Sequence, residues 1–211
     1  MNKLKFDGVI FDFDGVIMDT EKYHYLAWKE VFKVINYDFQ EEEYYPLRST
    51  GRTFIINYIQ DKLDIKLEEE VILQMLNIKS SVFDELIKNL SEKDLIDGVR
   101  EFLDYLHENR FPLAVASSSK TVKGLLVKYD LDKYFSVVLD GNTEFKKKPA
   151  PDIFIEAKRL LNINDPVVFE DSKVGVEAAF SANMTCVAIG GLKTPKAALE
   201  LKNFKEIKKY I

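Results

Sequence analysis

The chain of 211 residues has one cysteine and no long apolar run. A single cysteine cannot form an internal disulfide, which excludes a disulfide-stapled fold and predicts a reducing, cytoplasmic location. No apolar stretch approaches the about 18 residues that span a bilayer, so we expect no membrane segment. The first residues reach Asp7 before any apolar stretch of signal-peptide length, and we expect no secretory signal.

The chain also lacks an excess of basic charge. The 30 Lys and Arg residues are outnumbered by 35 Asp and Glu residues, which gives a formal net charge of −5. We therefore expect no nucleic-acid partner, although a local cluster of cations can still bind a small anion. The 46% hydrophobic and 31% charged residues are typical of a globular chain that folds without disulfides. Nothing in the sequence requires a dimer, so we expect a monomer.

Five short apolar runs predict the strands of a buried sheet. They span residues 8–13, 112–117, 136–140, 166–170 and 184–189. Amphipathic helical patterns accompany them at 99–109, 122–129, 153–161 and 174–182. The alternation predicts an α/β fold with a doubly wound, Rossmann-like parallel sheet, in the strand order 3-2-1-4-5. Cys186 lies inside the last run, and we interpret it as a core residue.

Residues 20–90 contain no strand-like run. Helical patterns cover 22–34, 53–63 and 68–90 instead. We interpret this stretch as a helical cap domain inserted after the first strand, so that the core domain comprises residues 1–19 and 91–211. Such an insertion leaves the right-handed crossovers of the sheet intact.

Acidic and hydroxyl side chains end three of the predicted strands. Asp12 and Asp14 end the first strand, Ser117 ends the second, and Glu170 and Asp171 end the fourth. In an extended strand, residues i and i+2 face the same side, so Asp12 and Asp14 are expected to project together. Ligands bind at the carboxyl ends of parallel strands, and the predicted order brings these three ends to one place.

Each motif also has an ordinary structural interpretation. Asp12 and Asp14 precede Gly15 and fit a turn. Ser172 or Asp171 fits the N-cap of the following helix, and the serines at 117–119 fit a polar loop. Lysines 146–148 fit a solvated charge run, although the proline after the third favours an extended backbone that can direct its side chain.

Together these residues resemble the haloacid dehalogenase superfamily of phosphotransferases. The stretch IFDFDGVIMD at 10–19 is similar to its first motif, an apolar strand followed by DxDGxxxD. Ser117 is similar to the second motif, Lys148 before a proline to the third, and the acidic pair Glu170 and Asp171 to the fourth. The resemblance covers the whole chain, and the four parts in this order are highly specific.

The resemblance implies phosphoryl transfer with Mg²⁺. Asp12 would be the nucleophile that forms an aspartyl-phosphate, and Asp14 the general acid and base. Ser117 would hydrogen-bond the phosphoryl group, and Lys148 would neutralise its charge. The implied metal ligands are Asp12, the Asp14 main-chain carbonyl, Asp171 and Glu170, the last directly or through water. Haloacid dehalogenases themselves are expected to lack the acid/base aspartate, so its presence favours phosphoryl transfer.

The inserted segment resembles the cap of β-phosphoglucomutases, because residues 19–28 are similar to a DTxxxHxxAW stretch. The resemblance implies that His24 helps to switch the acid/base residue, and that Trp28 lies near the substrate. Arg52 and Lys79 fall where that group places cations for a second phosphate. The candidate substrate-binding residues are His24, Trp28, Arg52, Lys79 and Ser118. The alternative interpretations are buried helix residues for His24 and Trp28, and surface cations for Arg52 and Lys79.

The chain departs from the family pattern at two places, of which the first leaves the activity open and the second fits turn chemistry. The loop at 48–52 reads RSTGR where the mutases have roughly KGxSR, and Asp97 replaces a common proline. The enzyme would either move phosphate between sugar positions, as a mutase, or hydrolyse it, as a sugar-phosphate phosphatase. A receiver-type signalling domain uses similar strand-end aspartates but has no helical insertion. A non-catalytic phosphate binder and a dehalogenase that esterifies Asp12 are the remaining alternatives.

Overall fold

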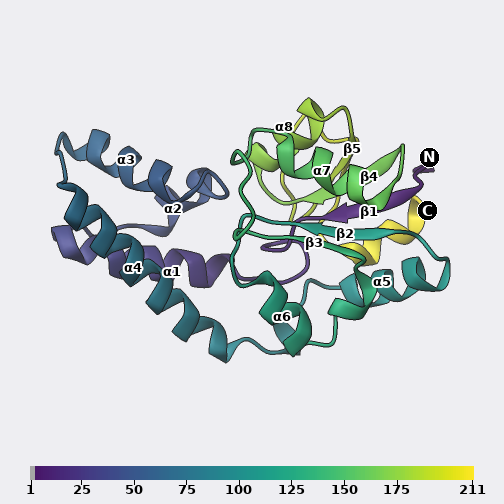
Figure 1. Cartoon of the computed structure of the whole chain (residues 1–211), viewed down its shortest axis with the longest axis horizontal. Helices are drawn as coiled ribbons and strands as arrows, with labels where there is room; N and C mark the ends of the chain where they lie inside the picture. The colour runs from purple at the N-terminus through teal and green to yellow at the C-terminus, as the bar shows by residue number, and fades with distance from the viewer. Residues whose placement is uncertain (1–2) are drawn as a thin grey trace. The chain divides into compact units, whose positions relative to one another are not determined.

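The computed structural model describes residues 3–211, so the first two residues of the predicted core segment 1–19 lie outside this description. The described residues form two compact units (Figure 1). One unit extends to Asp19 and resumes over Glu92–Ile211, and the other is Thr20–Ser91. The second unit is therefore an insertion in the chain of the first.

A six-stranded parallel sheet forms the centre of the first unit (Figure 1). Its strands are β1 (Gly8–Phe11), β2 (Leu113–Ala116), β3 (Val137–Leu139), β4 (Pro166–Glu170), β5 (Thr185–Ala188) and β6 (Leu199–Glu200). The order is β3-β2-β1-β4-β5-β6, and all the paired strands run parallel. The predicted fold class and the order of the first five strands are confirmed. Strand β6 was not predicted, because its two residues form no apolar run.

The predicted first strand is two residues too long. Strand β1 ends at Phe11, and the chain then turns, so that Asp14 forms an isolated bridge with Met18. Gly15 permits the turn because its φ is 72°, in the left-handed region that favours glycine. The expectation that Asp12 and Asp14 share one face of an extended strand is therefore wrong, although both follow the carboxyl end of β1.

The two faces of the sheet pack against different helices. The helices of this unit are α5 (Val99–Glu108), α6 (Val122–Lys128), α7 (Asp152–Leu161) and α8 (Lys173–Ser181), with 3₁₀ helices η4 (Glu92–Asp94), η5 (Asp132–Tyr134) and η6 (Phe204–Lys209). Ile10 and Val168 pack against α7 and α8 in one apolar cluster. On the other face, the rings of Phe11 and Phe169 stack 5.3 Å apart and contact Phe102 of α5. Figure 1 draws α5 and α7 on opposite sides of the sheet. The sheet is thus buried on both faces, as the continuous apolar runs predict.

The inserted unit is helical and has its own aromatic core. It contains α1 (Glu21–Phe32), α2 (Glu41–Tyr44), α3 (Arg52–Leu63) and α4 (Glu69–Leu86), with 3₁₀ helices η1 (Lys33–Ile35), η2 (Tyr45–Leu47) and η3 (Ile87–Asn89). The ring of Trp28 stacks on Phe32, with centroids 5.5 Å apart, and Phe39 belongs to the same cluster. Helix α2 was not predicted, because four residues are too few for a periodic pattern. Within residues 3–211, no helix has both the length and the apolar content needed to cross a membrane.

The chain leaves and re-enters the first unit at two adjoining segments. Met18 and Leu95 form an antiparallel bridge. Beside it, the N–H of Asp19 donates to the carbonyl oxygen of Asp94 at 2.7 Å. The two ends of the insertion are therefore tied together within the sheet-containing unit.

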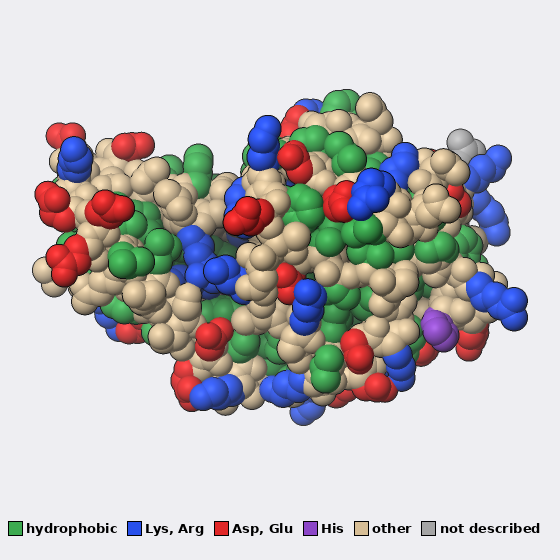
Figure 2. All heavy atoms as spheres, in the orientation of Figure 1, with side chains coloured by type: hydrophobic (Ala, Val, Ile, Leu, Met, Phe, Trp, Pro, Cys, Tyr) green, Lys and Arg blue, Asp and Glu red, His purple; other side chains and the backbone are tan. Residues whose placement is uncertain are grey.

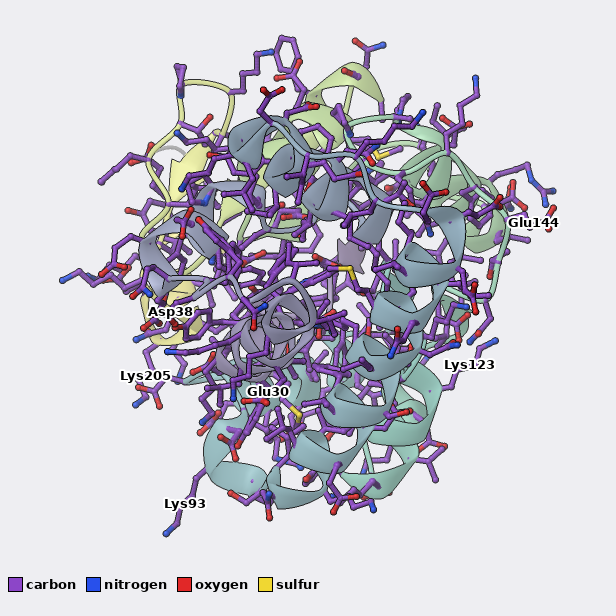
Figure 3. All side chains as sticks on the ribbon, turned by 90° about the vertical axis from the view of Figure 1, so that its left-hand side faces the viewer. Glu30, Asp38, Lys93, Lys123, Glu144 and Lys205 are labelled. Atoms are coloured by element: carbon purple, nitrogen blue, oxygen red, sulfur yellow. The ribbon has the colours of Figure 1, made fainter. Side chains whose placement is uncertain are left out.

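Charges of both signs are interspersed over the face shown in Figure 2. In Figure 3 the labelled side chains of Lys93 and Glu144 extend away from the ribbon. Lys205 lies 3.0 Å from Asp97, and both side chains are exposed. Exposed pairs of this kind contribute about 0–1 kcal/mol, so the surface charges add little to stability.

Candidate active site

Two neighbouring strand ends and one loop gather four buried charged side chains. Asp12 follows β1, Glu170 and Asp171 lie at the end of β4, and Lys148 comes from the loop before α7. None of the four is more than 3% exposed. The Asp12 N–H donates to the carbonyl oxygen of Phe169 at 3.0 Å, which sets Asp12 beside the end of β4. The sheet itself thus brings together acidic residues that are far apart in the sequence.

The Lys148 ammonium bridges two of these carboxylates. Its Nζ donates to Glu170 Oε1 at 2.6 Å and lies 3.3 Å from Asp12 Oδ1. It also lies 4.7 Å from the ring centroid of Phe154. Burial by itself lowers the pKa of Lys148, but the charges of Asp12 and Glu170 outweigh it and raise the pKa above its ordinary value. Lys148 therefore stays protonated.

The two bridged carboxyl groups differ in their pKa. Burial raises the pKa of Asp12 well above its usual range, Lys148 opposes the rise, and Glu170 and Asp14 add to it. Burial acts on Glu170 in the same direction, but Lys148 and the hydrogen bonds from Ser172 outweigh it and lower the pKa. Burial therefore disfavours the ionised form of Asp12, whereas the contacts of Glu170 favour its ionised form.

The acidic trio fits a hard divalent cation. One carboxylate oxygen from each of Asp12, Glu170 and Asp171 lies within 4.8 Å of the others. When all three are ionised, their charge of −3 and the +1 of Lys148 leave −2, which one divalent cation balances. Buried charges are costly unless they are paired or coordinate a metal, and Mg²⁺ prefers oxygen ligands. The donor set and its charge therefore match the predicted magnesium site.

Asp14 lies in the turn after β1, and its side chain is half-buried. The next residue, Gly15, lies directly against Asp171, because a Cβ built at Gly15 would be 2.3 Å from Asp171 Oδ2. The turn thus needs glycine both for its positive φ and for this close approach. The turn therefore places the backbone after Asp14 directly beside Asp171, a candidate metal ligand.

Ser117 directly follows β2, the strand on the other side of β1 from β4. It is 1% exposed, and its N–H donates to the carbonyl oxygen of Leu139 at 3.0 Å. Its Oγ accepts a hydrogen bond from the Ser119 N–H at 3.2 Å. The hydroxyl proton is thus not used in that bond and can be donated to a ligand oxygen. Ser118 is half-buried in the same loop.

In the helical unit, His24 and Lys79 form a pair between α1 and α4. Lys79 is 1% exposed, and its Nζ lies 2.7 Å from His24 Nδ1. A lysine ammonium only donates hydrogen bonds, so in a pair with charged Lys79 the acceptor is His24 Nδ1. Phe83 stacks on the His24 ring at 4.0 Å and lies under the ammonium at 4.0 Å. The interpretation of Lys79 as a surface cation is therefore wrong.

Arg52 and Trp28 occupy different environments of the helical unit. Arg52 begins α3, and its Nη1 donates to Ser80 Oγ at 2.8 Å. Burial lowers the pKa of Arg52, with Asp84 opposing. Trp28 is 2% exposed within the aromatic core, so the ordinary core interpretation accounts for its position. The substrate contacts predicted for His24, Trp28, Arg52, Lys79 and Ser118 stay predictions.

Ser172 has a role at the site that the sequence reasoning missed. The predicted N-cap of α8 is confirmed, because Ser172 Oγ accepts from the Gly175 N–H at 3.1 Å. The same residue also donates to Glu170 Oε2, from its N–H at 2.8 Å and from its hydroxyl at 2.9 Å. The available signal was the spacing, since a serine two residues after a strand-end glutamate can reach back to its carboxylate.

Known proteins similar to this chain match it over most of its length. A family model described as haloacid dehalogenase-like hydrolase matches residues 9–189. The chain is 34% identical over 201 residues to a phosphorylated carbohydrates phosphatase of Thermotoga maritima, covering 92% of this chain and 90% of the relative. It is 31% identical over 187 residues to a β-phosphoglucomutase of Bacillus subtilis, covering 87% of this chain and 83% of the relative. The crystal structure of a β-phosphoglucomutase from Clostridium difficile matches with a TM-score of 0.88 at 27% identity. The match covers 96% of this chain and 93% of that structure's chain.

Proposed function

Because the chain belongs to the haloacid dehalogenase-like hydrolases, we propose that it transfers the phosphoryl group of a sugar phosphate through an aspartyl-phosphate on Asp12. The observation that carries this proposal is the buried cluster in which Lys148 contacts Asp12 and Glu170 beside Asp171. A buried carboxylate next to a fixed ammonium and further oxygen ligands is suited to attack on phosphorus. The two relatives, a mutase and a phosphatase of phosphorylated carbohydrates, supply the substrate class.

The proposed mechanism divides the work among four side chains. Asp12 attacks phosphorus and the bond to the leaving oxygen breaks, while Asp14 protonates that oxygen. Asp14 then takes a proton from the next acceptor, which attacks the phospho-Asp12. Ser117 donates its hydroxyl proton to the phosphoryl group, and Lys148 neutralises the charge on it. Phosphate monoester hydrolysis needs up to about 10²¹-fold acceleration, and a general acid or base supplies only about 10²–10⁴, so these groups must act together.

We propose that Asp12, Glu170 and Asp171, with the main-chain carbonyl of Asp14, hold Mg²⁺. When bound, the metal supplies positive charge that stabilises the transferring phosphoryl group. For the chain itself, the consequence concerns Asp12, whose raised pKa marks an unfavourable carboxylate in the metal-free cluster. A nearby cation favours the ionised form, which is the nucleophile.

We assign the selection of the substrate to residues 20–90, as a cap domain. The candidate contacts are His24, Trp28, Arg52 and Lys79 from the helical unit and Ser118 from the α/β unit. His24 and the cap cations resemble those of the β-phosphoglucomutases, which favours a mutase. The loop RSTGR at 48–52, which departs from the mutase pattern, favours a sugar-phosphate phosphatase as the second candidate. The two differ in whether a sugar or water reaches the phospho-Asp12 first.

The test is an incubation of the purified protein with β-glucose 1-phosphate, Mg²⁺ and a trace of glucose 1,6-bisphosphate. Glucose 6-phosphate and free phosphate are measured together. Glucose 6-phosphate with little free phosphate establishes the mutase, whereas free phosphate as the main product establishes the phosphatase. A protein that forms neither product, and no acid-stable phosphoenzyme from acetyl phosphate, contradicts phosphoryl transfer altogether.

A further inference from the structure

We propose that Ser172 and Gly175 are positioning residues that fix the Glu170 carboxylate for the metal site and for Lys148. The inference rests on the proposed function and adds two residues to it. Glu170 is 0% exposed, and its Oε2 accepts two hydrogen bonds from Ser172, from the N–H at 2.8 Å and from the hydroxyl at 2.9 Å. Both donors meet the same oxygen and fix its position, while Oε1 is left to accept from Lys148.

Gly175 supplies the space that this carboxylate occupies. A Cβ built on Gly175 would lie 1.8 Å from Glu170 Oε1 and 2.4 Å from Oε2. No real Cβ makes such contacts, and the nearest atoms are the carboxylate that the site must keep in place. The Gly175 N–H also donates to Ser172 Oγ, which orients the hydroxyl proton toward Glu170. Glycine is required here by space, because Gly175 is an ordinary residue of α8 without a positive φ.

The position of Glu170 determines the position of Lys148. With Oε2 held by Ser172, Oε1 receives the Lys148 ammonium at 2.6 Å, and that ammonium reaches Asp12 Oδ1 at 3.3 Å. A displaced Glu170 would therefore alter both the acidic trio and the contact between Lys148 and Asp12. Partners that orient metal-site residues typically change metal affinity or activity by about 10–100-fold when they are removed.

Mg²⁺ binding to the purified protein without substrate provides the test, measured by isothermal titration calorimetry. Gly175→Ala is expected to weaken Mg²⁺ binding about 10–100-fold, because the new Cβ displaces Glu170. Gly124→Ala is the matched control, since a Cβ at this α6 glycine meets nothing within 4 Å. This control is expected to bind Mg²⁺ as the wild type does.

Ser172 is tested separately, because it also caps α8. Ser172→Ala removes the hydroxyl and is expected to weaken Mg²⁺ binding about tenfold or more, whereas Ser172→Thr keeps a hydroxyl and should restore most of the affinity. Asn203→Ala removes a different side-chain cap, that of η6, where Asn203 accepts from the Lys205 N–H. It measures the effect of losing a cap alone, and its Mg²⁺ affinity is expected to be unchanged.

The outcomes separate this inference from the proposed function. Wild-type protein that binds Mg²⁺, with folded Gly175→Ala and Ser172→Ala variants that bind it equally well, overturns the positioning role alone. Wild-type protein that binds no Mg²⁺ overturns the metal site and the inference with it. Circular dichroism establishes that each variant is folded. If Gly175→Ala does not fold, the comparison of Ser172→Ala with Ser172→Thr decides.

Discussion

The two units hold their buried lysines in different ways. In the α/β unit, Lys148 contacts two carboxylates, at 2.6 and 3.3 Å. In the helical unit, Lys79 contacts the imidazole of His24 at 2.7 Å and the ring of Phe83 at 4.0 Å. The Lys148 ammonium contacts the proposed reacting groups. Hydrogen bonds of the sheet hold the strand ends that carry these groups. The Lys79 ammonium is fixed by side chains on two helices. The difference agrees with the division we propose, in which the α/β unit carries out the phosphoryl transfer and the helical unit selects the substrate.

The largest expected effect comes from the nucleophile. Asp12→Asn should lower turnover by about 10⁴-fold or more on every substrate and abolish the phosphoenzyme, because an amide does not attack phosphorus. Steady-state rates with an aryl phosphate and a sugar bisphosphate measure the first effect, and labelling from radioactive substrate measures the second. Asp165→Asn, at an exposed side chain, should change neither. A phosphoenzyme formed by Asp12→Asn contradicts the assignment.

Next in size is the effect of Lys148 on stability. Lys148→Met leaves Asp12 and Glu170 buried without their ammonium, so we expect the free energy of unfolding to fall by about 3–5 kcal/mol. Urea unfolding followed by circular dichroism measures it. Lys147→Met, one residue earlier and exposed, should stay within about 0.5 kcal/mol of wild type. If the two variants are equally stable, the buried ion pairs of Lys148 do not contribute to the stability of the α/β unit.

Arg52→Ala should separate substrates rather than stop the chemistry. A charged hydrogen bond is worth about 1.5–3 kcal/mol, so we expect kcat/KM to fall about 10–100-fold for substrates with a distal phosphate and little for aryl phosphates. Lys62→Ala removes an exposed cation from the same helix and should leave this selectivity unchanged. Equal losses of kcat/KM on both classes of substrate would make Arg52 a structural residue. Arg52 would then give no support to substrate selection by the helical unit.

The smallest effect concerns Cys186, which lies in β5 and is 1% exposed. Burial raises the pKa of its thiol, Glu170 adds to the rise, and Lys148 opposes it. We expect no reaction with a thiol reagent at pH 8 until the α/β unit unfolds in urea. Because the chain has one cysteine and one tryptophan, in different units, thiol labelling and Trp28 fluorescence follow the two units separately. Rapid labelling of the native protein would contradict the buried position.

The α/β unit was more predictable from sequence than the helical unit, for a physical reason. Parallel strands place their carboxyl ends at one edge, so apolar runs and the residues that follow them were enough to predict that Asp12 and Glu170 lie together. The turn after β1 was given only as the alternative to a longer strand, because an apolar run does not show where pairing ends. The contact between His24 and Lys79 depends on how α1 packs against α4, 55 residues apart in sequence, and no local pattern encodes it.

The tied ends of the insertion have a consequence for how such a chain diversifies. The Asp19 N–H bonds the Asp94 carbonyl, and Met18 bridges Leu95, so the gap that the insertion fills is closed by the backbone of the α/β unit itself. A segment of different length or sequence can occupy that gap without moving a strand. If the inserted unit selects the substrate as we propose, sequence changes confined to residues 20–91 can alter the substrate while the strand ends of the α/β unit keep their places.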